Sequence, residues 1–154
     1  MPIRKMEQKD IPAVLEIQNA LAFQDWNERQ MAQEIASNYT YAEVYESENF
    51  AILGYAVFHL LGPDSELLSI AVSESAQRKG VGKELMSSGF SLLNFDEGDC
   101  CFLEVRESNQ KARRFYEKFG FQFFGIRKKY YSDGENAALY KADRTSVNEL
   151  SKGI

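Results

Sequence analysis

Apolar residues recur at three- and four-residue spacing along the first part of the chain, which is typical of amphipathic helices. One helix is expected after Asp10, a candidate N-cap, with Pro12 in its first turn. A second helix is predicted over Glu28–Ala36, with Asn27 as its cap. Both should turn their apolar faces toward a common core.

The spacing then shortens to two residues, and aromatic and β-branched residues become frequent. Tyr39–Tyr45 and Phe50–Leu61 flank a polar tip, and together they predict a β-hairpin. A glycine–proline turn then leads into a further strand, Glu66–Val72.

The second half of the chain returns to helical spacing. A broad apolar stripe predicts a helix over 80–94. Asn109 can cap a shorter helix that ends at Phe119. The segments 121–131 and 137–140 flank a glycine-containing turn and predict a closing hairpin.

The expected elements follow the order strand, two helices, three strands, helix, strand, helix and two strands. This order predicts a mixed α/β sheet with helices on its faces. A length of 154 residues suits one domain with one hydrophobic core, which we place at residues 1–143. Residues 144–154 are polar and are expected to form a C-terminal tail.

Composition narrows the class of protein. With 44% hydrophobic and 27% charged residues, and no apolar run near the roughly 20 residues of a membrane helix, a soluble globular protein is expected. The first residues, MPIRKMEQKD, lack the apolar core of a signal peptide, which favours the cytoplasm. A net charge of −5 argues against a nucleic-acid partner. Cys100 and Cys101 are adjacent and His59 is the single histidine, so we expect reduced thiols and no metal site.

A basic, glycine-bearing loop, QRKGVG (residues 77–82), links an expected strand to an expected helix. Backbone N–H groups and the positive end of the helix dipole meet at such a point, and Gly80 and Gly82 let an anion approach. Arg78, Lys79 and Lys83 add positive charge. The loop matches neither common nucleotide-binding fingerprint. Taken alone, it leaves an anion site and an ordinary turn equally open.

Glu104 is the single charged residue in the apolar run Cys100–Val105, which we expect to be a central strand covered on both faces. Desolvation there would make its carboxylate a stronger base, as a general base requires. The alternative is a structural ion pair with Arg106 or another cation. Tyr116 lies on the apolar face of the next helix, either as a core tyrosine or as a phenol beside the same site.

These residues lie within two longer segments that resemble a known family. IAVSESAQRKGVGKELM and LEVRESNQKARRFYEKFGF are similar to the GNAT superfamily of N-acetyltransferases, whose Q/R-x-x-G-x-G/A motif matches Gln77, Gly80 and Gly82. The second segment, with RKKYYSDGENAALY after it, resembles the branch of bacterial ribosomal-protein-alanine N-acetyltransferases (RimI type). The similarity covers roughly residues 50–142. Residues 23–27, FQDWN, depart from the FPWS-like word of that branch, and this leaves two classes of acceptor open.

The resemblance implies a mostly antiparallel seven-stranded sheet with about four helices, in which two central parallel strands splay apart. It implies acetyl-CoA as co-substrate. The pantetheine arm would pair with the backbone of Ile70, Ala71 and Val72, and Asn109 would also contact the cofactor. The pyrophosphate would lie on the backbone amides of the loop and first helical turn, which are Arg78, Lys79, Gly80, Val81, Gly82 and Lys83.

The resemblance also implies roles in the reaction. Glu104 matches the general base, Tyr116 the general acid, and Tyr130 and Tyr131 the paired tyrosines beside the acceptor, although aromatic packing in a hairpin also explains that pair. The acetyl group would pass directly to an amine, most simply the α-amino group of a protein such as a ribosomal protein. A small-molecule amine is the alternative acceptor, and a non-catalytic acyl-CoA-binding module is a third reading. No membrane partner is expected.

Overall fold

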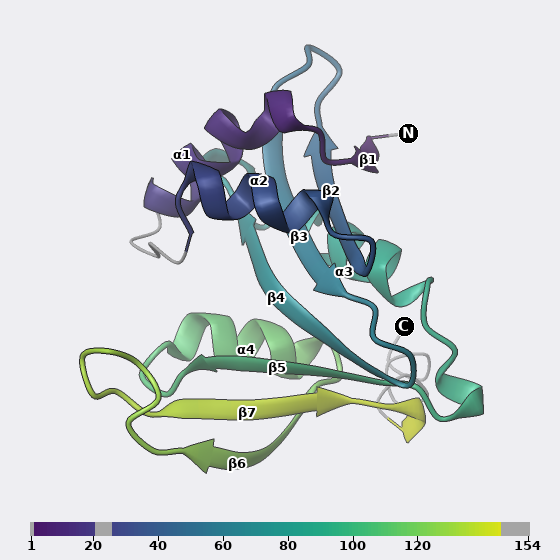
Figure 1. The fold of residues 1–154 in the computed structure, drawn as a ribbon, viewed down its shortest axis with the longest axis vertical. Coiled ribbons are helices and arrows are strands. Elements are labelled where there is room, and N and C mark those ends of the chain that lie inside the picture. Colours follow the sequence, from purple (N-terminus) through teal and green to yellow (C-terminus); the bar gives the residue numbers. More distant parts are fainter. Residues whose placement is uncertain (1, 21–25, 146–154) are drawn as a thin grey trace. The chain divides into compact units, whose positions relative to one another are not determined.

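A computed structural model describes residues 2–20 and 26–145 of the chain (Figure 1). Its strands are β1 (Ile3–Lys5), β2 (Thr40–Glu46), β3 (Ile52–His59), β4 (Asp64–Val72), β5 (Cys100–Arg106), β6 (Gln122–Arg127) and β7 (Ala137–Ala142). Its helices are α1 (Ile11–Ala20), α2 (Glu28–Ala36), α3 (Val81–Phe90) and α4 (Gln110–Lys118).

The seven strands follow the order β1-β2-β3-β4-β5-β7-β6 in one sheet. β4 and β5 are parallel, and the pairs β1–β2, β2–β3, β5–β7 and β6–β7 are antiparallel. The parallel pairing joins only Asp64, Ser65 and Glu66 to Cys100, Cys101 and Phe102. The expected mixed, mostly antiparallel sheet is therefore confirmed.

The chain divides into two compact units by its internal packing. The first unit comprises residues 1–60 and 67–92, and the second comprises 61–66 and 93–154. The assignment of residues 1–143 to one domain, with 144–154 as a tail, stays a prediction.

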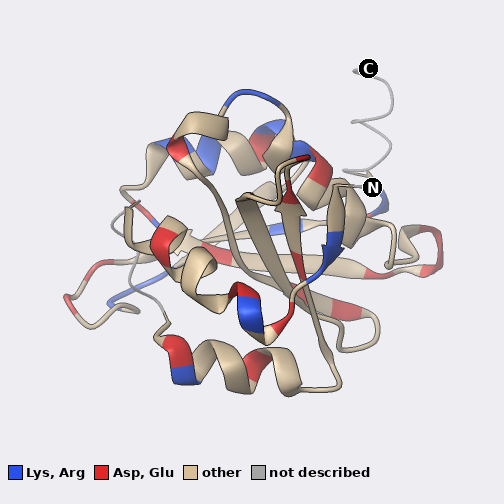
Figure 2. Cartoon of the chain, turned by 90° about the horizontal axis from the view of Figure 1, so that it is seen from above, with Lys and Arg blue, Asp and Glu red and all other residues tan. Residues whose placement is uncertain are grey.

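In the first unit, α1 and α2 lie on one face of β2 and β3, and α3 lies on the other (Figures 1 and 2). Side chains of β2 and β3 alternate accordingly, because neighbours on a strand point to opposite faces. Those that face α1 and α2 belong to a core cluster that includes Val14, Met31, Val44 and Tyr55. Phe58 instead packs against Gly89 of α3.

In the second unit, α4 covers one face of β5 and β7. The Tyr140 hydroxyl accepts a hydrogen bond from Arg113 Nε at 2.9 Å and donates one to Glu117 Oε2 at 2.6 Å, which ties β7 to α4. Tyr140 pairs with Leu103 across the strands, so Leu103 points toward the same face. Glu104, the next residue, points toward the opposite face.

Several expected boundaries were wrong. The third helix ends at Phe90 rather than 94, and Leu92, expected on its buried stripe, is 50% exposed because the chain turns after Ser91. β6 ends at Arg127, and Lys129 takes a left-handed backbone (φ 51°), so Tyr130 and Tyr131 lie in a loop rather than a strand.

The expected caps had mixed outcomes. Asn27 and Asn109 accept hydrogen bonds from the backbone N–H groups of Gln30 and Ala112, as N-caps do. Asp10 does not cap α1: its carboxylate accepts from the Arg4 guanidinium and from the Glu7 amide of the preceding turn.

Candidate active site

The loop between β4 and α3 has the backbone of an anion cradle. Arg78 and Gly80 both adopt left-handed conformations, with φ of 65° and 84°. Left-handed residues in such turns direct successive N–H groups toward one concave point. Gly80 is the N-cap of α3 and, as a glycine, makes no side-chain cap to that terminus. The first-turn N–H groups of α3 therefore lack the acceptor that an N-cap side chain usually provides.

The surroundings of this loop also suit an anionic ligand. Arg78, Lys79 and Lys83 are exposed, and a methyl group added to Gly80 would meet nothing within 4 Å. The Gln77 side-chain amide donates to the Val72 carbonyl at 3.1 Å, which fastens the loop to the end of β4. These residues fit the pyrophosphate of a coenzyme A ester, because the loop offers backbone donors, positive charge and open space at one place.

Glu104 is exposed in the structure, so the expectation of a buried carboxylate was wrong. Burial along β5 alternates, with Leu103 and Val105 buried and Glu104 exposed between them. α4 covers one face of this strand and leaves the other open within the second unit. The strand was expected to be covered on both faces because Phe102 also points toward the open face and masks the alternation in the sequence.

Two side chains, one from the end of β6 and one from the loop after it, lie near Glu104. Arg127 Nη1 lies 3.4 Å from Glu104 Oε1, and Glu104 is the first of the groups that act on the Tyr130 hydroxyl. The hydrogen bond to Glu104, together with partial burial and the negative charges of Glu104 and Glu66, raises the pKa of Tyr130. The expectation that Glu104 pairs with a cation is thus met by Arg127 and not by Arg106.

Arg106 is engaged elsewhere. Its Nη1 lies 2.8 Å from Asp133 Oδ2 and 3.0 Å from Glu135 Oε1, and its guanidinium lies over the Tyr131 ring. Glu135 also accepts a hydrogen bond from the Ser108 amide at 2.9 Å. The loop that carries Tyr130 and Tyr131 is therefore anchored to the end of β5 by charged contacts.

Tyr116 and Asn109 belong to the other face of this unit. Tyr116 lies on α4, with its ring edge-to-face with Phe115 and Phe121, and Asn109 caps the same helix. The structure thus brings Glu104 together with Tyr130 and Arg127, and it places Tyr116 on the helix that covers the opposite face of β5. The proposed acid and cofactor roles of Tyr116 and Asn109 stay predictions.

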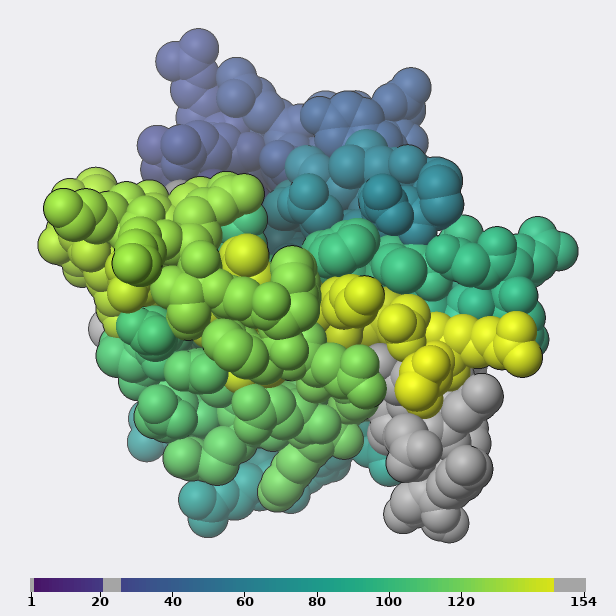
Figure 3. Space-filling view, turned by 90° about the horizontal axis from the view of Figure 1, so that it is seen from below, coloured from purple at the N-terminus to yellow at the C-terminus, as the bar shows by residue number. Residues whose placement is uncertain are grey.

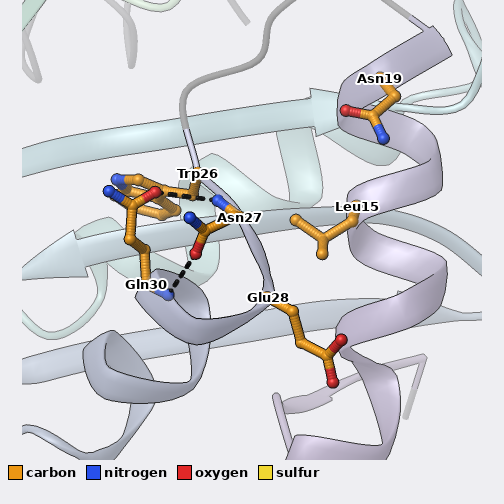
Figure 4. Close-up of a pocket in the computed structure, with 6 residues that line it drawn as sticks. All are labelled: Leu15, Asn19, Trp26, Asn27, Glu28 and Gln30. Carbon is orange, nitrogen blue, oxygen red and sulfur yellow. Dashed lines mark hydrogen bonds between the residues drawn. The ribbon is translucent and has the colours of Figure 1, made fainter.

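A pocket of about 480 Å³ lies in the first unit between α1 and the start of α2 (Figure 4). Its lining residues are Leu15, Asn19, Trp26, Asn27, Glu28 and Gln30. The divergent word FQDWN contributes Trp26 and Asn27 here, whereas residues 23–25 lie outside the described part of the chain. Asn27 and Gln30 bond each other's backbone and so fix one wall of the pocket.

Figure 2 shows acidic and basic residues interspersed along the elements of the chain. Within residues 2–20 and 26–145, no group of three His, Cys, Asp or Glu side chains is placed to hold a metal ion. None of the helices in this part of the chain is both long and apolar enough to cross a membrane.

Residues 4–121 match the model of the acetyltransferase (GNAT) family. This chain belongs to the GNAT family. It is an acetyl-CoA-dependent N-acetyltransferase, with acetyl-CoA as the co-substrate of that family.

Individual relatives indicate which branch of the GNAT family this chain resembles. The [ribosomal protein bS18]-alanine N-acetyltransferase of Escherichia coli K12 is 32% identical over 143 residues, which are 91% of this chain and 95% of that enzyme. The N-alpha-acetyltransferase RimI of Mycobacterium tuberculosis is 32% identical over 136 residues, covering 85% of this chain and 84% of that protein. This GNAT chain is therefore similar to the bS18-alanine N-acetyltransferase branch.

Solved structures agree with the fold. Ard1 from Thermoplasma volcanium superposes with a TM-score of 0.80 at 29% identity, covering 92% of this chain and 95% of that one. The ribosomal-protein-S18-alanine N-acetyltransferase of Escherichia coli gives 0.78 at 29% identity, covering 92% of each chain.

Sequence reasoning missed the partners of Glu104. Arg127 and Tyr130 are distant from it in sequence, and the register that brings them close includes an irregularity between Phe123 and Gly125. The alternating pattern of a strand does not locate such a bulge. The available signal was the run RKKYY, residues 127–131, in which three cationic residues precede two tyrosines where the edge strand β6 ends.

Proposed function

We propose that this GNAT enzyme acetylates the N-terminal α-amino group of a protein, with a ribosomal protein of the bS18 type as its physiological acceptor. The observation that carries this proposal is the 32% identity over 91% of the chain to the Escherichia coli [ribosomal protein bS18]-alanine N-acetyltransferase. The aromatic pair Tyr130 and Tyr131 beside Glu104 supports it, because amphipathic rings can wall a slot for a short peptide end.

The proposed reaction needs a neutral amine. An α-amino group has a pKa of about 7.7–8.0, against about 10.4 for a lysine side chain, so one carboxylate suffices to take its proton near neutral pH. We assign that role to Glu104, acting directly or through one water. Its exposure on an open face supports the assignment, since a base must be reachable by its substrate.

The co-substrate supplies the acetyl group as a thioester. The amine nitrogen forms a bond to the acetyl carbon, the carbon–sulfur bond breaks, and Tyr116 donates its phenolic proton to the departing sulfur. The backbone N–H near Val72 is the proposed donor for the oxygen that becomes negative during transfer. No cysteine takes up the acetyl group in this scheme, because the single histidine, His59, is paired with Glu34 rather than with a thiol.

The proposed cofactor residues belong to the first unit. Ile70, Ala71 and Val72 at the end of β4 would pair with the pantetheine arm, and residues 77–83 would hold the pyrophosphate. The uncapped N-terminus of α3 and the left-handed Arg78 and Gly80 support this assignment. Neutralising Arg78 and Lys79 together should weaken binding of coenzyme A more than binding of a fragment without the pyrophosphate. Equal losses for the two ligands would count against the cradle.

A second acceptor class has its own supporting observation. The FQDWN segment departs from the branch and contributes Trp26 and Asn27 to the pocket of Figure 4. A small-molecule amine such as a polyamine is therefore the alternative acceptor.

One activity screen separates the two. The purified enzyme is given acetyl-CoA with a peptide that begins with alanine, the same peptide blocked at its N-terminus but carrying a free lysine, and spermidine. We expect turnover of the first only. Turnover of spermidine without turnover of the alanine peptide would contradict the proposal.

A further inference from the structure

Arg127 lies between Glu104 and Tyr130 on the open face of the second unit and contacts both side chains. Arg127 Nη1 lies 3.4 Å from Glu104 Oε1. The Arg127 guanidinium carbon lies 4.9 Å from the centre of the Tyr130 ring. Arg127 therefore contacts both Glu104 and Tyr130.

The register of the strands explains why these residues meet. Glu104 of β5 lies opposite Leu139 of β7, and Leu139 lies opposite Gly125 of β6. Residues opposite one another on neighbouring strands point to the same face, so Glu104, Leu139 and Gly125 form one row across the sheet. Gly125 has no side chain. Arg127, two residues further along β6, points to the same face and can extend over Gly125 toward Glu104.

A second arginine lies on the same face but is not available to Glu104. Arg106 belongs to the neighbouring row, opposite Ala137. Its guanidinium is held by Asp133 and Glu135 and is covered by the ring of Tyr131. Arg127, in contrast, has Glu104 as its ion-pair partner among the described residues, and its side chain is 55% exposed.

The Glu104–Arg127 contact is of the kind that a substrate can replace. It is a single contact at 3.4 Å between partly exposed side chains, and such pairs add little to stability. An incoming ammonium group would compete with the guanidinium for the same carboxylate oxygen. Arg127 would keep its position over the Tyr130 ring after releasing Glu104, because cations are attracted to aromatic faces.

We infer that Arg127 is a positioning residue: it holds Glu104 and Tyr130 in one arrangement on the open face and yields Glu104 to the ammonium group of the acceptor. The inference rests on the proposed role of Glu104 as the base. Arg127 itself does not touch the reacting atoms. Figure 3 shows β6 and the loop after it at the near surface, where an acceptor can reach them.

The first test does not depend on activity. The charged groups that act on the Tyr130 hydroxyl are Glu104, Glu66 and Arg127, and Arg127 opposes the other two by lowering the pKa of Tyr130. The phenol is followed by carbon-13 NMR of tyrosine-labelled protein, with Tyr130→Phe to assign the signal. In Arg127→Gln the pKa of Tyr130 should rise further, whereas Lys128→Gln, on the exposed neighbouring residue, should leave it unchanged. An unchanged Tyr130 titration in Arg127→Gln would overturn the inference.

The second test separates positioning from acceptor binding. With the alanine-starting peptide, Arg127→Gln should lower kcat about tenfold without raising the KM of the peptide, because a competing cation is lost. The KM of acetyl-CoA should not change. Arg127→Lys keeps the charge and should recover kcat to within about threefold of the parent. A raised peptide KM at parental kcat would contradict the positioning role.

The two proposals fail in different ways. If the parent enzyme turns over no alanine peptide, the proposed function is wrong. The Tyr130 titration still decides whether Arg127 positions Glu104 and Tyr130. If the parent is active and Arg127→Gln matches it in both kcat and titration, the positioning role alone is wrong.

Discussion

The Arg106 guanidinium carbon lies 4.2 Å from the centre of the Tyr131 ring, directly over its face. Arg106 ends β5, two residues after Glu104, while Tyr131 lies in the loop between β6 and β7. This stack, with the ion pairs to Asp133 and Glu135, fixes the loop that carries both tyrosines. The loop is thereby held by charge and stacking rather than by strand pairing.

Arg106→Met should release that loop. The change removes two ion pairs and the stacking contact, and it replaces the arginine by an unbranched apolar side chain. Because the ion pairs are partly exposed, we expect a loss of only about 1 kcal/mol in the free energy of unfolding. The KM of an alanine-starting peptide should rise severalfold while the KM of acetyl-CoA stays constant. Arg106→Lys is the control for charge without the planar stack, and equal effects on both KM values would refute the loop's role.

Glu43 predicts a pH-dependent stability. It is fully buried on β2, where Oε2 accepts a hydrogen bond from Tyr41 at 3.1 Å and Oε1 has no hydrogen-bond partner among the described residues. Burial raises the pKa of Glu43 from 4.5 to about 7, although hydrogen bonds from Ser88 and Tyr41 oppose the shift. The folded state therefore holds the Glu43 proton more tightly than the unfolded state. The stability that this tighter binding contributes is fully present below pH 4.5 and is lost as the pH rises through 7.

Glu43→Gln removes that titration. The free energy of unfolding is measured with urea at pH 5 and at pH 8. Relative to the parent, the value for the variant should be about 1–3 kcal/mol higher at pH 8 than at pH 5. Glu48→Gln, on the exposed β2–β3 turn, is the control and should show no such gain. The same difference between Glu43→Gln and the parent at both pH values would mean that Glu43 is charged in the folded protein throughout this range.

The close approach of Phe58 requires a glycine at position 89. A Cβ built on this residue of α3 overlaps the ring of Phe58, which is completely buried. Gly89→Ala should therefore destabilise the protein by roughly 1–3 kcal/mol, although alanine favours helix by about 1 kcal/mol. Ser87→Ala, on the exposed side of α3, serves as the helix control. Thermal unfolding of Gly89→Ala combined with Phe58→Leu should recover part of the loss, and a stabilised single variant would show that the ring adapts.

Cys100 should be a poor nucleophile. Partial burial, followed by the carboxylates of Asp143, Asp64 and Asp99, raises the pKa of the Cys100 thiol, and Lys141 only partly offsets them. Alkylation by iodoacetamide at pH 7.5 should be about tenfold slower than that of a free cysteine peptide, since the thiolate is the reactive form. Asp143→Asn should speed it. Cys100→Ser should keep acetyl transfer, and an acetylated cysteine after incubation with acetyl-CoA alone would contradict direct transfer.

The order of elements was predictable from the sequence because hydrophobic period, caps and turn residues each act locally. Asn27 and Asn109 cap the helices that follow them for this reason. The burial of Glu104 was mispredicted because it depends on which face of β5 is covered by α4, and a short apolar run does not specify that. The roles of the QRKGVG loop, Glu104 and Tyr116 came from family resemblance, whereas the contacts of Arg127 and Arg106 came only from the folded register.

The central claim is that Glu104 takes the proton from the acceptor amine. The most direct measurement compares Glu104→Gln with the parent for acetyl transfer to an alanine-starting peptide at neutral pH, with acetyl-CoA affinity measured on the same samples. Loss of a general base should lower kcat/KM roughly 100-fold or more and leave acetyl-CoA affinity within about twofold. Parental turnover in Glu104→Gln, with acetyl-CoA bound normally, would contradict the claim.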